Sequence, residues 1–199
     1  MPIQFAKEPQ NGSTLVNASL AQLSTRIPSG LPPSLAGVNF GALSVQAPHA
    51  IFDLQADAIT QGKGLASARA TGFRYPVEVA GVSVAAAEVH ADASGSANLV
   101  ANINCGPFVA ASAQALNDLA KLAPVNAGQF EACLLRFSAI PLMAIWLKST
   151  GGASDLIYPL EPAPSVLVAG KLYSESDFLK AVMPIAQKRV ASGGSQPVP

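Results

Sequence analysis

Strict alternation of apolar and polar residues in the middle of the chain is the feature that most constrains the fold. From residue 50 to residue 104 the alternation has a period of two, which is typical of strands with one buried face. Four runs carry it, over residues 52–58, 66–71, 85–93 and 99–105. The sequence therefore predicts a sheet in this part of the chain.

The connections between the four runs predict how these strands pair. Residues 62–64, 75–76 and 94–96 are rich in Gly, Pro and Ser, and they are too short to contain a crossover helix. We therefore expect antiparallel neighbours in a meander. One face is rich in alanine, including Ala87 and Ala91, so that a helix can approach it closely. The other face carries most of the ionisable side chains of this region.

Apolar spacing and capping residues predict the remaining elements. Helices are expected over residues 107–122, 127–137 and 174–190. Ser174 and Asp177 resemble a capping box at the start of the last helix. Further strands are expected over residues 141–148, 155–160 and 166–169. Together these elements predict an α+β fold, in which an antiparallel sheet of about five to seven strands packs on two or three helices.

The N-terminal segment differs from the rest of the chain in charge. Residues 9–52 contain one charged side chain, Arg26, and an apolar helical stripe of Val16, Leu20, Leu23 and Ile27. We divide the chain into an arm (1–49), a single α+β domain (50–191) and a flexible tail (192–199). A segment so poor in charge must be buried or leave an adhesive surface. This predicts a homo-oligomer, or a protein partner, held through the arm.

The charge balance, the lack of a long apolar segment and the cysteine spacing exclude some classes of partner and favour one cellular location. The 12 basic side chains balance 12 acidic ones, and no basic cluster is present, so nucleic acid and anionic membrane surfaces are not expected to bind. No window approaches the roughly 18 apolar residues of a membrane span. No signal-like segment opens the sequence, and the two cysteines form neither a CxxC pair nor part of a Cys/His cluster with zinc spacing, which favours a cytoplasmic protein with free thiols.

The clearest chemical motif is Glu88-x-His90-x-Asp92. On a strand these side chains project from one face about 6.6 Å apart, so that neighbours can ligate a metal ion or pair a carboxylate with the imidazole. The other ionisable residues expected on that face are Asp53, Asp57 and Arg69. A simpler interpretation is a solvated or salt-bridged face. This simpler interpretation is favoured because no second histidine is near His90 in the sequence. The other histidine, His49, lies beside a proline in the arm.

Three other groups are weaker candidates. Cys105 precedes a predicted helix, whose dipole would activate a thiolate, but it falls on the apolar side of its strand, opposite His90. Cys133 lies in an apolar stripe and is assigned to the core. Trp146 and Tyr158 are aromatic groups with a polar tip, which suit either a binding surface or the edge of a core.

No catalytic set is complete, because His90 has no second histidine near it in the sequence and Cys105 has no base on its own face. The sequence therefore predicts a non-enzymatic binding or assembly protein, acting through the polar sheet face and the uncharged arm. The alternative is a metal-dependent or hydrolytic enzyme that uses Glu88, His90 and Asp92. The sequence identifies no cofactor, and it leaves open whether these three residues hold a metal.

Overall fold

A computed structural model of the chain describes residues 2–25, 31–137 and 139–193. The strands are β1 (Ile3–Phe5), β2 (Leu43–Val45), β3 (His49–Leu54), β4 (Arg69–Val79), β5 (Val82–Ala91), β6 (Ala97–Asn104), β7 (Phe130–Phe137), β8 (Leu142–Ser149), β9 (Leu156–Pro159) and β10 (Tyr173–Ser174). The α-helices are α1 (Gly12–Ser24), α2 (Ala56–Thr60), α3 (Pro107–Leu119), α4 (Ala123–Asn126) and α5 (Glu175–Ala191). Short 3-10 turns lie at Pro33–Leu35, Phe40–Ala42 and Leu65–Ser67.

All ten strands belong to one sheet, with the order β10-β9-β8-β7-β3-β4-β5-β6. Strand β1 also pairs with β7, and β2 with β4. Most neighbours are antiparallel, but β7 pairs in parallel with both β1 and β3. The prediction of an α+β fold with a mainly antiparallel sheet is confirmed, whereas the predicted five to seven strands are too few. Two of the additional strands, β1 and β2, come from the segment assigned to the arm.

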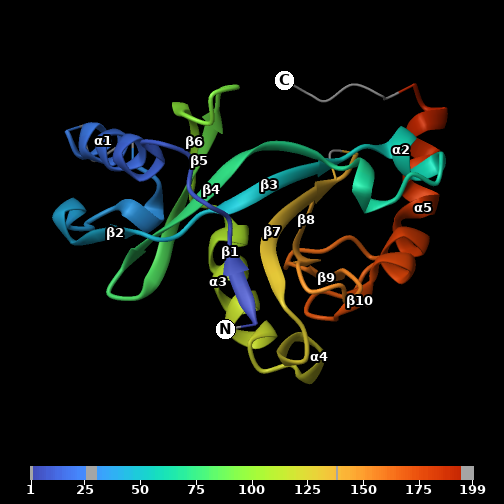
Figure 1. Cartoon of the computed structure of the whole chain (residues 1–199). Helices are drawn as coiled ribbons and strands as arrows, with labels where there is room; N and C mark the ends of the chain where they lie inside the picture. The colour runs from blue at the N-terminus through green and yellow to red at the C-terminus, as the bar shows by residue number, and fades with distance from the viewer. Residues whose placement is uncertain (1, 26–30, 138, 194–199) are drawn as a thin grey trace.

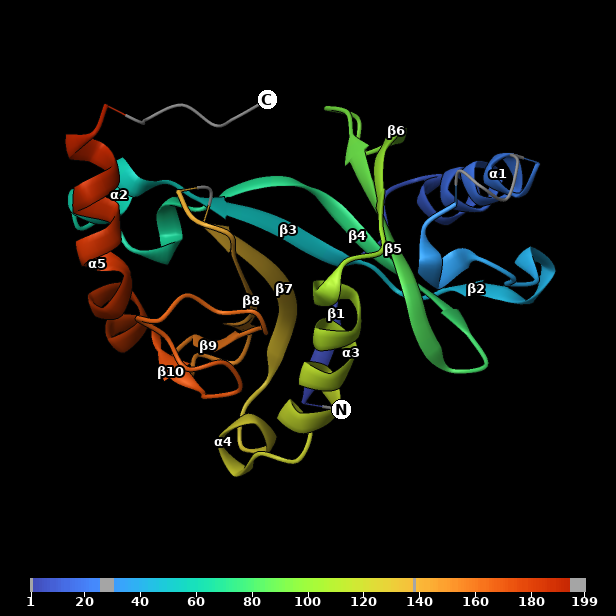
Figure 2. The same ribbon diagram turned by 180° about the vertical axis from the view of Figure 1, so that it is seen from behind.

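Helices cover the sheet at three places. Helix α5 packs with α2 at one end of the molecule, and α1 lies beside β5 and β6 at the other end (Figure 1). Helix α3 lies on the sheet between them, as the view from behind shows (Figure 2). Strand β7 is buried on both sides, because Leu135 packs in the cluster with Phe178 of α5, and Leu134 packs in the cluster with Leu119 of α3.

Several predicted elements are confirmed. Helix α3 begins at Pro107, where the missing N–H of proline costs no helical hydrogen bond. Helix α5 begins after Ser174, whose hydroxyl accepts a hydrogen bond from the backbone N–H of Asp177 at 3.1 Å. Strands β8 and β9 occupy the predicted positions, and their pairing forms the expected hairpin.

The predicted helix over residues 127–137 is wrong, because this segment forms β7. The segment is apolar on both faces, since α5 covers one and α3 the other. A strand buried on both sides has a nearly continuous apolar sequence, which the apolar period alone does not distinguish from a helix. Cys133 is nevertheless fully buried in the core, as predicted.

The predicted turn at residues 75–76 is also wrong, because β4 continues through it to Val79. Strand β4 pairs on one edge with β3 up to Arg74 and with β2 from Val77 onward. Pro76 falls in the gap between these two partners, so its missing N–H interrupts neither ladder. Two other boundaries differ: the first predicted strand ends at Leu54, where α2 soon follows, and residues 166–169 form no strand.

The apolar stripe of the N-terminal segment is buried within the chain. Val16 and Leu20 of α1 are 0% and 3% exposed, and they pack in one cluster with Ala87 and the other small residues of β5. This confirms that a helix covers the alanine-rich face. Gly12 permits the approach, because a Cβ atom there would lie 1.9 Å from the Tyr75 hydroxyl. Leu23 is partly buried, while Ile27 and most of the predicted tail lie outside the described residues.

Candidate functional site

The polar face of the central sheet carries two buried charged side chains at its middle. Glu88 on β5 and Arg74 on β4 are only 9% and 3% exposed. The first turn of α3 lies beside them, because Gly106 and Phe108 line the same cavity as both side chains. The simpler interpretation of this face is that it is either solvated or salt-bridged. At Glu88 it is salt-bridged, to Arg74 and Arg136.

One carboxylate oxygen of Glu88 accepts hydrogen bonds from side chains of three strands. Its Oε1 atom accepts from Nη1 of Arg74 at 2.8 Å and from Nδ2 of Asn104 at 2.9 Å. It also accepts from Nη2 of Arg136 on β7. Burying a charge is costly unless it is paired and hydrogen-bonded, and these three donors satisfy that condition for the carboxylate. We call Arg74, Glu88, Asn104 and Arg136 the arginine cluster.

The arginine cluster carries an excess of positive charge. Burial lowers the pKa of Arg74, the nearby Glu88 carboxylate raises it, and a guanidinium stays charged at neutral pH. Two guanidiniums therefore share one carboxylate. Asp53 lies near enough to interact with Arg136 and Glu88, but burial raises its pKa, and no ion pair of Asp53 lies within 4.0 Å among the described residues.

A cavity of about 230 Å³ lies against the arginine cluster. The remaining lining residues are Asn102, Gly106, Phe108 and Met143. The N-terminal turn of α3 therefore borders the cavity with its positive dipole end, and the helix has no acidic residue in that turn. Guanidinium and amide donors on one side and apolar groups on the other suit a small molecule with an anionic end.

The other two members of the predicted motif lie elsewhere. His90 is exposed, and its Nδ1 atom is 2.9 Å from the backbone oxygen of Thr71. Asp92 lies beyond the end of β5, where its Oδ1 accepts from the backbone N–H groups of Ser94 and Ser96 at 2.8 and 3.1 Å. Hydrogen bonding from Ser94 lowers the pKa of Asp92 and holds a turn.

The structure does not bring Glu88, His90 and Asp92 together. Glu88 is buried in the arginine cluster, His90 is exposed beside the Thr71 backbone, and Asp92 lies past the end of β5 in a turn. Within residues 2–25, 31–137 and 139–193, no three His, Cys, Asp or Glu side chains are grouped so that they could hold a metal ion. The geometry therefore offers the proposed metal and acid–base chemistry no support.

The remaining candidates are also dispersed. Asp57 is exposed in the first turn of α2, and Arg69 is exposed at the start of β4. Trp146 donates from Nε1 to Oδ2 of Asp155 at 2.8 Å, so its polar tip is engaged within the hairpin of β8 and β9. Tyr158 is buried in the core, and this burial raises its pKa. Of the predicted binding residues, Glu88 alone lines the cavity, with Asp53 near it.

Sequence reasoning missed the donors of this site. The sequence predicts a helix at Arg136 and a turn directly after Arg74, so it does not identify either residue as a partner of Glu88. The available signal was alternation: in β4 and in β5, Arg74 and Glu88 stand out of phase with their buried apolar neighbours. The register pairs these two residues directly across the strands.

No helix in the described parts of the chain is both long and apolar enough to cross a membrane. Comparison of the chain with protein-family models, with curated proteins and with solved structures returned no match.

Proposed function

We propose that the protein is a non-enzymatic binding protein whose arginine cluster holds a small carboxylate ligand. The observation that carries this proposal is the convergence of two guanidiniums, from Arg74 and Arg136, on one oxygen of Glu88 beside a cavity. Each guanidinium has five N–H donors, so donors remain for a second acceptor. Paired N–H donors match the planar geometry of a carboxylate.

Charge balance favours a monoanion over phosphate. Among the four residues of the cluster, two positive side chains and one negative side chain leave a single positive charge, which the nearby Asp53 carboxyl offsets in part where it is ionised. A monocarboxylate neutralises that charge, whereas a phosphate dianion would leave a negative charge beside the Glu88 carboxylate. Phe108 and Met143 supply an apolar wall for the body of the ligand. The proposed ligand is therefore a small carboxylic acid with an apolar part.

Titration of the whole protein with benzoate, hexanoate and inorganic phosphate, followed by calorimetry or ligand-observed NMR, tests this proposal. We expect the carboxylates to bind more tightly than phosphate, with an affinity that falls as salt is added. Replacing Arg136→Gln should weaken carboxylate binding about tenfold or more, because a charge-assisted hydrogen bond is lost. The matched control is Arg69→Gln, since Arg69 is exposed and does not line the cavity.

Circular dichroism of both variants separates loss of binding from loss of folding. Arg136 is suited to this test because its side chain is 28% exposed, against 4% for Arg74. Equal weakening by Arg136→Gln and Arg69→Gln would contradict a specific site. Tighter binding of phosphate would overturn the assignment to carboxylates, and saturable binding of none of the three anions would overturn the function itself.

Self-association through the N-terminal segment remains a prediction. Its apolar stripe is already buried within the chain, so the original reason for a second subunit is weaker. Leu15 and Leu23 are only partly buried and leave some apolar area on α1. Sedimentation velocity tests the prediction, and a single monomeric species at micromolar concentration would contradict it. The proposed cytoplasmic location is supported by two free cysteines, Cys105 and Cys133.

A further inference from the structure

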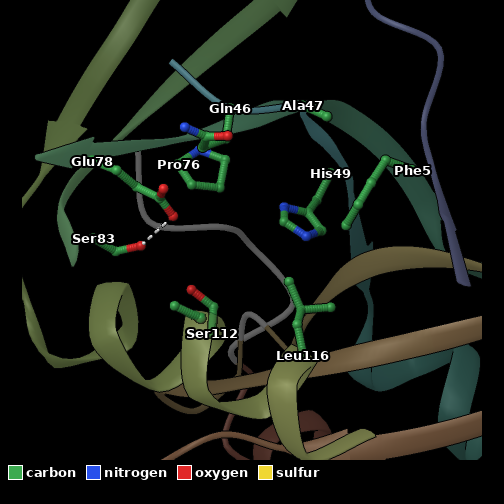
Figure 3. A pocket seen from close by; sticks show the side chains of 10 residues that line it. Phe5, Gln46, Ala47, His49, Pro76, Glu78, Ser83, Ser112 and Leu116 are labelled. Atoms are coloured by element: carbon green, nitrogen blue, oxygen red, sulfur yellow. Dashed lines mark hydrogen bonds between the residues drawn. The ribbon is translucent and has the colours of Figure 1, made fainter. Parts of the chain in front are cut away.

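A second cavity lies on the same face of the sheet, along the side of α3. Its volume is about 200 Å³, and it shares no lining residue with the cavity at the arginine cluster. Strands β3, β4 and β5 supply one wall, and Ser112 and Leu116 of α3 supply the opposite one (Figure 3). Phe5 of β1 closes one end. A cavity of about 150 Å³ accommodates benzene, so this one has room for a substituted ring.

Glu78 gives this cavity a negative charge. It is the only Asp, Glu, Lys or Arg residue of the lining. It is partly buried, and within the described ranges it forms no ion pair shorter than 4.0 Å. His49, the other titratable residue of the lining, is buried, and its pKa of about 4 leaves it neutral at neutral pH. A carboxylate that is partly removed from water and has no counterion is stabilised by a bound cation.

Two serines beside Glu78 present hydrogen-bond acceptors to the cavity. An ionised carboxylate can only accept, so the Ser83 hydroxyl donates its proton to Glu78, at 3.2 Å. The Ser112 hydroxyl donates its proton to the backbone oxygen of Val109 at 2.9 Å. Each hydroxyl has a single proton, so both oxygens have only lone pairs left for a further partner. Both serines lie on the side of the cavity to which the Glu78 carboxylate points (Figure 3).

The other lining groups agree with a ligand that has a donor at one end and an apolar body. Gln46 donates from Nε2 to Ser44 at 3.0 Å, so its Oε1 is a further acceptor at the polar end. Away from that end the lining is apolar, with Phe5 and Leu116 around the imidazole of His49 (Figure 3). A primary ammonium has one positive charge and three N–H donors, which match a carboxylate and two hydroxyl oxygens.

We propose that this second cavity binds a small primary amine, whose ammonium group contacts Glu78 and whose apolar body lies between Leu116 and Phe5. This site goes beyond the proposed carboxylate function, because it has the opposite charge and shares no residue with the arginine cluster.

Ligand-observed NMR with benzylamine and benzyl alcohol on the whole protein tests the proposal. The two probes have the same ring, but benzyl alcohol is uncharged, so we expect benzylamine to bind about tenfold more tightly. In Glu78→Gln this preference should disappear while the ring still binds. The matched control is Glu161→Gln, because Glu161 is exposed and outside the cavity, and it should keep the preference.

A third probe distinguishes a free amine from a lysine side chain of another protein. Nα-acetyl-lysine amide carries the same ammonium, but its two amide groups exceed the space of a cavity of about 200 Å³, so we expect it to bind more weakly than benzylamine. Tighter binding of the lysine derivative would overturn the assignment to a small amine.

A measurement on the unmodified protein guards against a variant that does not fold. In protein with ¹³C-labelled leucine methyl groups, benzylamine should shift the resonances of Leu116, whereas those of Leu65, which packs in the cluster with Phe178, should not respond. Equal affinity for benzylamine and benzyl alcohol, or Leu116 resonances that benzylamine does not move, would overturn the proposal. Failure of carboxylate binding at the arginine cluster would leave these readouts unchanged, so the two proposals can fail separately.

Discussion

The buried histidine makes the stability of the protein depend on pH in a calculable way. His49 has a pKa of about 4 in the folded protein against 6.5 when exposed, because burial disfavours the charged ring and the charge of Arg74 adds to this effect. Below pH 6.5 the unfolded chain therefore binds a proton that the folded protein does not take up until pH 4. The stabilising contribution is complete above pH 6.5 and is lost as pH falls toward 4.

The difference between the two pKa values corresponds to about 3 kcal/mol of unfolding free energy. We expect the free energy of unfolding to fall by about 1.4 kcal/mol per pH unit between 6.5 and 4 from this group alone. The measurement is chemical denaturation of the wild type and of His49→Gln, whose side chain does not titrate, at several pH values. The expected result is a difference between the two proteins that changes with this slope.

Other titratable groups also change the free energy of unfolding with pH, but they do so in both the wild type and His49→Gln. The difference between the two proteins therefore reports on His49. Burial raises the pKa of Asp53, so its neutral form is favoured in the folded protein, and its contribution is present at low pH and lost as pH rises. That dependence has the opposite sign, but it is common to both proteins. A difference in unfolding free energy that stays constant between pH 7 and 4.5 would refute the reasoning, because His49 would then titrate equally in the folded and unfolded states.

Three further predictions follow from packing and exposure. Replacing Glu88→Ala should cost about 3 to 5 kcal/mol in urea denaturation, because it leaves buried Arg74 without its counterion, and a loss below 1 kcal/mol would contradict the buried pair. Ala87→Leu should cost about 1 to 3 kcal/mol by overpacking α1, whereas a matched change at exposed Ala101 should be nearly neutral. A thiol reagent should label partly buried Cys105 before buried Cys133, whose pKa burial raises, and the reverse order under native conditions would show the burial to be misassigned.

Local sequence signals predicted the starts of helices α3 and α5 correctly. Pro107 and Ser174 mark helix starts that depend on backbone chemistry within one turn, so they can be identified from sequence. Strand β7 could not be identified in this way, because its burial on both faces depends on helices far away in the chain. The parallel pairing of β7 with β1 and β3 joins segments separated by more than 70 residues, and nothing local encodes it.

The site was predicted only in part for the same reason. Glu88 was singled out by its strand face, but its partners depend on pairing: Arg74 across one ladder and Asn104 and Arg136 from two other strands. The boundary of the arm at residue 49 follows from the low charge of the N-terminal segment and includes His49, although His49 is the first residue of β3. Burial of a histidine cannot be deduced from a sequence that does not show which helix covers it.

Strand β4 makes the molecule unusually sensitive to a change in chain length at one place. Arg74 and Pro76 line the two cavities on the α3 side, while Tyr75 and Val77 belong to the core beneath α1. Inserting or deleting a single residue before Arg74 would exchange these two sets, since successive side chains of a strand point to opposite faces. Evolution can therefore vary side chains along β4 one at a time, but length variation among descendants of this chain should be confined to its turns.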